Sequence, residues 1–132
     1  MQPLQTFGTS HALQMFVLAG LLLVGSASTI VQAAELVMFE AKGCTVCRSF
    51  NQDAGKDYAT SAAAKILPLR RIDLHEDKID IKLKLPVTMT PTFVFVKDGS
   101  EITRFVGYPG RKFFFQIVDT AADELRKLES RQ

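Results

Sequence analysis

The chain has 132 residues, a length typical of one domain, and its 16 basic and 14 acidic side chains nearly balance. This balance gives no reason to expect a nucleic-acid or membrane-surface partner. The charge is unevenly placed, because no Lys, Arg, Asp or Glu precedes Glu35. We therefore divide the chain into an uncharged targeting segment and a charged domain of about 100 residues, which is long enough to fold alone.

We interpret residues 1–33 as a cleaved signal peptide. Residues 13–24 are mostly apolar and have the length of a signal h-region. Val31 and Ala33 fit the small-residue pattern of a signal-peptidase site, so cleavage is expected after Ala33. Because the n-region lacks Lys and Arg, an uncleaved anchor and a wrongly assigned start remain alternatives. An anchor is disfavoured, since the apolar run is shorter than the ~20 residues that cross a bilayer.

The domain that follows, residues 34–132, begins with a strand–helix–strand pattern. The apolar run at 35–40 predicts a buried strand, and Cys44 opens a helical stretch that we expect Gly55 to break. Residues 61–67 have helical composition, and residues 68–74 supply a second strand. Since a helix connects these two strands, we expect them to be parallel.

The second half of the chain predicts a connector and a hairpin. Residues 75–90 are a polar connector whose amphipathic piece, 79–85, fits either a helical turn or an extended segment. Two strands, 92–97 and 101–106, flank an Asp-Gly turn signal and should pair antiparallel.

The last element, residues 111–128, is predicted as an amphipathic helix. Its expected apolar stripe consists of Phe114, Ile117, Val118, Ala121, Leu125 and Leu128. The resulting order, β-α-β and then β-β-α, predicts an α/β fold with a four-stranded mixed sheet and helices on both faces.

The predicted chemistry depends on Cys44 and Cys47, the only cysteines in the chain. They lie where the first strand leads into the first helix. A thiolate is stabilised there, because a helix N-terminus presents free N–H groups and a partial positive charge. Positions i and i+3 share a helix face, so Cys44 is predicted to attack a substrate disulfide and Cys47 to resolve the mixed disulfide.

Other uses of this cysteine pair fit the sequence less well. Covalent haem attachment requires His after the second cysteine, where the chain has Arg48. A structural zinc site requires four ligands and an iron–sulfur cluster needs more thiolates, whereas the mature chain adds only His75. An inert disulfide remains an alternative, although so short a loop would stabilise little. We therefore expect no metal and no cofactor.

Together, Cys44-x-x-Cys47, Thr90-Pro91 and the Gly-Tyr-Pro-Gly turn that begins at Gly107 resemble periplasmic thioredoxins over the whole mature chain. The resemblance implies a thioredoxin-like fold in which Pro91 is cis, faces the dithiol and, with the Thr90 backbone, binds an extended substrate segment. A trans proline that begins a strand is the alternative. For Gly107 the resemblance implies a close backbone approach near the dithiol; turn chemistry alone also explains this glycine.

Residues 36–40 and 69–76 resemble, more narrowly, the SoxS-type thioredoxins found with bacterial sulfur-oxidation systems. This resemblance implies a monomeric periplasmic reductase that keeps a cysteine of a thiosulfate-oxidation carrier protein reduced. Its electrons would come from a membrane dithiol transporter. Thr45 and Val46, between the cysteines, do not exclude an oxidase that donates its disulfide. A non-catalytic metal-binding module is the alternative from another class.

The sequence departs from the thioredoxin pattern around the dithiol. Gly43 stands where many thioredoxins have Trp, and Met38 replaces the buried Asp of cytosolic thioredoxins. The proton-relay role of that Asp has no matching side chain. Glu40 is near enough in sequence to influence the thiols, although the pattern does not orient it. Arg71 is interpreted as part of a solvated basic face.

Overall fold

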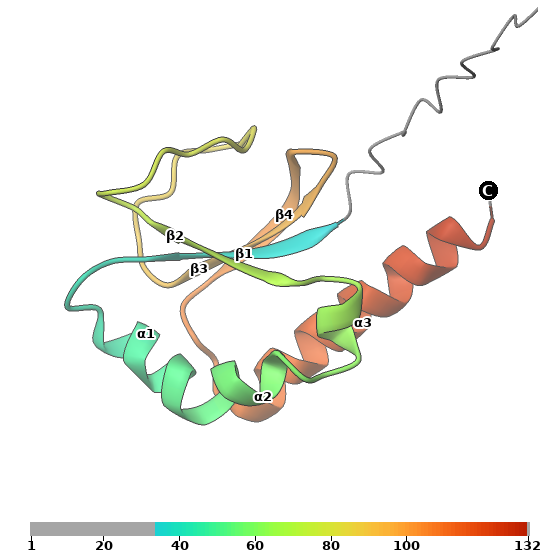
Figure 1. The fold of residues 1–132 in the computed structure, drawn as a ribbon, viewed down its shortest axis with the longest axis horizontal. Coiled ribbons are helices and arrows are strands. Elements are labelled where there is room, and N and C mark those ends of the chain that lie inside the picture. Colours follow the sequence, from blue (N-terminus) through green and yellow to red (C-terminus); the bar gives the residue numbers. More distant parts are fainter. Residues whose placement is uncertain (1–33, 132) are drawn as a thin grey trace, which may run out of the picture.

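The computed structural model describes residues 34–131, which form a four-stranded sheet of order β2-β1-β3-β4 (Figure 1). The four strands are β1 (Glu35–Glu40), β2 (Leu69–Asp73), β3 (Thr92–Lys97) and β4 (Ser100–Val106). Strand β1 pairs in parallel with β2 and antiparallel with β3, which continues into β4 as a hairpin. The predicted mixed sheet is therefore confirmed. The proposed signal peptide and its cleavage site lie outside the described residues.

The hairpin turn has the geometry that its sequence predicts. Asp98 and Gly99 both have positive φ, 51° and 70°. Two consecutive positive φ angles match the right-handed twist of the flanking strands, which is why Asp-Gly pairs are common in such turns.

Three helical pieces follow one another without interruption: α1 (Thr45–Phe50), the π-helical η1 (Asn51–Gly55) and α2 (Lys56–Tyr58). The predicted break at Gly55 is wrong, since its φ and ψ of −60° and −38° are helical. Phe50, Ala54 and Tyr58 are spaced four residues apart and are all buried. Their burial continues the helix through Gly55, whose cost in a helix is only about 1 kcal/mol.

The two remaining helical predictions need smaller corrections. Residues 61–67 form only a short 3₁₀ turn, η2 (Ala63–Lys65), whereas α3 (Arg111–Glu129) has nearly its predicted length. The predicted stripe of α3 is buried at Phe114, Val118 and Leu125, but Ala122, which was not predicted, is also buried, and Leu128 is 49% exposed. The C-terminal end of α3 extends past the sheet (Figure 1). No helix within residues 34–131 is long and apolar enough to cross a membrane.

All helices lie on one face of the sheet, which we call the helical face (Figure 1). Its core combines sheet side chains with helix side chains, chiefly Leu36, Met38, Phe93, Cys47, Phe50, Tyr58 and Phe114. The opposite face, which we call the connector face, is covered by the connector between β2 and β3 through Ile81 and Val87. The prediction of helices on both faces is therefore wrong.

The connector is extended because its apolar residues alternate with lysines. Ile81 is buried and Lys82 exposed, so one side packs on the sheet while the other faces solvent. Lys82 also forms a parallel bridge with the start of β4, where its N–H donates to Gly99 O over 2.9 Å. The Glu101 carboxylate accepts the Lys84 N–H at 2.8 Å and is paired with Arg104. The open choice for residues 79–85 is thus settled as an extended segment.

Candidate active site

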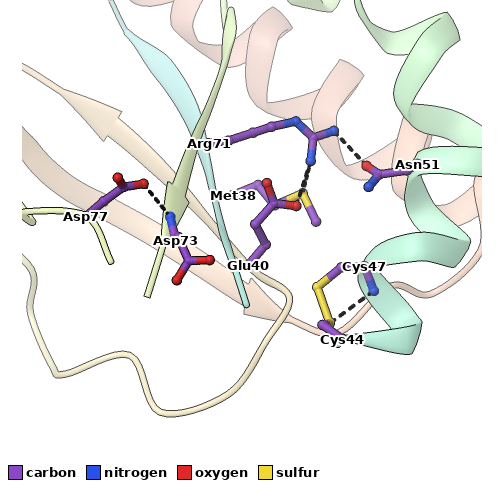
Figure 2. Close-up of polar contacts among 8 residues, drawn as sticks. All are labelled: Met38, Glu40, Cys44, Cys47, Asn51, Arg71, Asp73 and Asp77. Atoms are coloured by element: carbon purple, nitrogen blue, oxygen red, sulfur yellow. Dashed lines mark hydrogen bonds and ion pairs between the residues drawn. A yellow bond between two sulfur atoms is a disulfide. The ribbon is translucent and has the colours of Figure 1, made fainter. Parts of the chain in front are cut away.

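Cys44 and Cys47 form a disulfide at the junction of β1 and α1, with 5.3 Å between their Cα atoms (Figure 2). Cys44 is the N-cap of α1: its φ and ψ of −65° and 107° are extended, and its Sγ accepts the Cys47 N–H at 3.1 Å. The turn before it contains Gly43, whose φ of 82° favours glycine. The sequence therefore places one sulfur where the free N–H groups of a helix end converge.

The two cysteines differ in their access to solvent. Cys47 is 4% exposed and belongs to the core of the helical face, whereas Cys44 is half-buried at its rim. Thr45 and Val46, between them, are exposed. An incoming disulfide can reach the sulfur of Cys44, while the sulfur of Cys47 is shielded by the protein.

The Thr90–Pro91 peptide bond is cis, and Pro91 is buried. β1 ends beside the start of β3, since Phe39 pairs with Thr92. The dithiol loop and the Thr90–Pro91 segment therefore leave the same end of the sheet.

Gly107 joins this segment through a hydrogen bond from its N–H to Pro91 O at 2.7 Å. A Cβ added to Gly107 would have no neighbour within 4 Å, so the close approach implied for this glycine is wrong. Its φ of 83° is the physical reason for glycine here.

Aromatic side chains support the helix that follows the dithiol. The Phe50 ring lies 5.0 Å from Phe93, 4.9 Å from Phe114 and 5.5 Å from Tyr108, measured between centroids. The Tyr108 hydroxyl donates to Asp53 Oδ2 at 2.5 Å. Desolvation, together with this hydrogen bond to Asp53, raises the pKa of Tyr108. The contacts hold the Gly-Tyr-Pro-Gly turn against η1.

The sequence analysis missed an ion pair that lies beside the helix carrying the dithiol. Arg71 of β2 contacts Glu40 Oε2 at 2.8 Å and donates to Asn51 Oδ1 at 2.7 Å and to Met38 Sδ at 3.4 Å (Figure 2). Arg71 is exposed, as its interpretation as part of a solvated face predicts, but it is paired with Glu40 and Asn51 and is not a free basic group. The sequence did contain a signal for this pair. Glu40 and Arg71 carry opposite charges and lie near the carboxyl ends of two strands that were predicted to be adjacent and parallel.

Within residues 34–131, no group of three or more His, Cys, Asp or Glu side chains is arranged to hold a metal ion. His75 is exposed in the turn after β2.

The chain matches a family model described as a thioredoxin-like domain over residues 32–122. None of the curated protein sequences matches it significantly. Among solved structures it is similar to the periplasmic thioredoxin SoxS of Paracoccus pantotrophus in its reduced form. The identity is 29% and the TM-score 0.64, over 70% of this chain and 98% of that one.

Two eukaryotic thioredoxins share the fold at lower identity. The thioredoxin of Malassezia sympodialis is 18% identical with a TM-score of 0.55, over 70% of this chain and 80% of its own. The Drosophila thioredoxin Deadhead is 20% identical with a TM-score of 0.52, over 67% and 81%. The chain belongs to the thioredoxin-like family, and its Cys44–Cys47 disulfide makes it a thiol–disulfide oxidoreductase.

Proposed function

We propose that the protein is an exported reductase of protein disulfides, in which Cys44 attacks and Cys47 resolves. The observation that carries the proposal is the unequal exposure of the two sulfurs. Cys44 caps α1 at the surface, whereas Cys47 is 4% exposed within the core. A helix N-terminus favours the thiolate, the form that attacks disulfides.

The reaction balances as two exchanges. The Cys44 thiolate attacks one substrate sulfur, the substrate disulfide breaks, and the first substrate thiol leaves after gaining a proton. The Cys47 thiol then loses its proton and attacks the Cys44 sulfur. This step forms the Cys44–Cys47 disulfide and releases the second substrate thiol. Two electrons pass from the protein to the substrate, with one proton from Cys47 and one from solvent.

Thr90 and Pro91 are proposed to bind the substrate beside the dithiol. The support is their position: they leave the same end of the sheet as the dithiol loop, and Gly107 holds the Pro91 carbonyl. An extended substrate segment would pair with the Thr90 backbone, because main-chain hydrogen bonds recognise such segments largely independently of sequence.

The cellular setting is proposed from the N-terminal sequence and from the similarity to SoxS. Residues 1–33 would be removed after Ala33, which leaves the domain 34–132 in the periplasm as a monomer. The similarity to a periplasmic thioredoxin at 29% identity supports that location. A membrane dithiol protein would supply electrons, and the substrate would be a protein cysteine such as that of a sulfur-oxidation carrier. N-terminal sequencing of the exported protein should begin at Ala34.

Cysteine variants test the assignment of roles. Cys44→Ser should abolish the reduction of insulin disulfides, whereas Cys47→Ser should accumulate mixed disulfides with substrate proteins. The species are counted on non-reducing gels and identified by mass spectrometry. An active Cys44→Ser protein would refute the proposal, and so would mixed disulfides that form through Cys47 instead.

A further inference from the structure

The charged groups at the carboxyl ends of β1 and β2 are arranged around one guanidinium. Arg71 contacts the Glu40 carboxylate at 2.8 Å, and its second nitrogen donates to Asn51 Oδ1 at 2.7 Å. Its Cζ also lies 5.8 Å from the centre of the Phe50 ring. The Arg71 and Glu40 side chains are 38% and 26% exposed, so solvent screens this pair only in part.

These contacts place the pair against the helix that carries the dithiol. Met38, two residues before Glu40 on the same face of β1, is buried in one cluster with Cys47. Asn51 follows Cys47 by four residues, which is one helical turn. Figure 2 shows Arg71 reaching from β2 to the helix, with Glu40, Met38 and the disulfide on the same side of the sheet.

We propose that Glu40 and Arg71 are positioning residues that set the proton affinity of Cys44 by cancelling each other's charge at the dithiol. This inference rests on the proposed role of Cys44 as the attacking thiol. A carboxylate alone at this place would disfavour the thiolate, and a guanidinium alone would favour it. Held together, the two charges largely cancel and leave the positive potential of the helix end at Cys44 unopposed by Glu40.

Other charged groups lie near the dithiol, and the acidic ones after β2 are held by contacts of their own. The Asp73 carboxylate accepts the N–H groups of His75 and Glu76, at 2.9 and 3.2 Å, in the turn after β2. Asp77 binds the Asp73 N–H.

On the helical side, Asp53 is bonded to Tyr108, and Arg111 pairs with Asp57. Lys42 and Arg48 are exposed and make no ion pair among the described residues. All these groups remain present when Glu40 or Arg71 is replaced, so a difference between variants reports on the pair.

The test is the pH profile of Cys44 alkylation by iodoacetamide in the reduced protein, with the modified cysteine identified by mass spectrometry. Glu40→Gln should lower the pH of half-maximal rate, and Arg71→Gln should raise it. Each shift should be about 0.5–1 pH unit, a factor of about 3–10 in proton affinity. The double variant, Glu40→Gln with Arg71→Gln, should return close to the unmodified protein. Arg71→Lys keeps the positive charge, so its alkylation profile should also stay close to that of the unmodified protein.

A matched control lies on the same two strands. Arg70 binds Glu35 through two hydrogen bonds of 2.9 and 2.8 Å, at the amino end of β1, far from the dithiol. Glu35→Gln and Arg70→Gln should leave the alkylation profile unchanged. Thermal unfolding of every variant shows whether it is folded.

The proposal is overturned if the Glu40 and Arg71 variants shift the profile in the same direction, or no further than the controls do. A purely structural role for the pair predicts those results, because loss of stability does not reverse sign with the charge removed. Alkylation needs no substrate, so the outcome is separate from the turnover tests. An active Cys44→Ser protein would refute the reductase assignment while leaving this profile interpretable.

Discussion

The two faces of the sheet are covered by different means. On the helical face, packed aromatic rings hold the elements together, with Phe114 at their centre. On the connector face, an extended segment lies over Val94 and Val96 and is held at its edge by the Glu101–Arg104 pair.

This difference shows that the dithiol helix is anchored by an aromatic core, whereas the opposite face relies on an extended segment. The face that carries the dithiol helix has a dense core, so Cys47 is fixed and shielded. The connector face ends in Met89, which is 63% exposed and directly precedes the Thr90–Pro91 segment.

The largest expected effect comes from removing the centre of the aromatic core. Phe114 is fully buried, and its ring centroid lies 4.9 to 6.2 Å from six other rings. Phe114→Ala should lower the free energy of unfolding by about 3–5 kcal/mol in urea denaturation. Its neighbour Phe113 is 57% exposed, so Phe113→Ala should change it by less than about 0.5 kcal/mol. Equal losses would contradict the described packing of α3.

The next largest loss of stability is expected on the connector face, when its buried carboxylate, Glu101, is removed. Glu101 is 2% exposed in its side chain and accepts two hydrogen bonds from Arg104, both 2.6 Å. Glu101→Gln leaves Arg104 without its charged partner and should cost about 1–3 kcal/mol. It should also accelerate hydrogen exchange at the Lys84 amide. Glu124→Gln, which breaks an exposed pair with Lys127, should have no measurable effect.

Acid should weaken the connector face through the same carboxylate. The hydrogen bonds from Arg104 hold the pKa of Glu101 below its ordinary value of 4.5. The unfolded chain therefore takes up this proton at higher pH than the folded one. The contribution of the Glu101 carboxylate to the free energy of unfolding is fully present above about pH 4.5. It is lost as the pH falls through the lower pKa that Glu101 has in the folded protein. Between pH 7 and pH 3, Glu101→Gln should lose less stability than the unmodified protein; an equal loss would contradict this account.

The smallest of these effects concerns one hydroxyl on the helical face. Tyr58 is fully buried and donates to Leu67 O at 2.6 Å, which ties α2 to the segment before β2. Tyr58→Phe leaves that carbonyl without its donor and should cost about 1 kcal/mol. Ser49→Ala removes an exposed bond to Thr45 O and should change stability very little. If urea denaturation gives the same change in the free energy of unfolding for both variants, burial does not determine how much these hydroxyl hydrogen bonds contribute to stability.

The sequence predicts most of the architecture, because strands, the hairpin turn and the C-terminal helix are encoded locally. Two strand-forming segments on either side of the Asp-Gly turn defined the hairpin, and helical periodicity defined α3. Gly55 misled the prediction, since burial of Ala54 and Tyr58 on either side outweighs the local preference of a glycine. The cover of the connector face depends on tertiary contacts of Ile81 and Val87, which no local pattern specifies.

In the candidate site, too, features that are local in sequence were predicted and contacts between distant residues were not. The Cys44 and Cys47 pair is visible from its spacing, whereas the Thr90–Pro91 segment was identified through the resemblance to thioredoxins. The Glu40–Arg71 pair joins residues 31 positions apart and depends on the register of β1 with β2. A one-residue slip in that register would place Arg71 on the other face.

The reduction potential of the Cys44–Cys47 disulfide, measured by equilibration with glutathione buffers, tests the reductase assignment most directly. Protein dithiols range from roughly −270 mV for a reducing thioredoxin to about −120 mV for a strong oxidant. We predict a value near the low end, which requires a dedicated electron donor. A value near the high end would contradict the account and make the protein a donor of disulfides to other proteins.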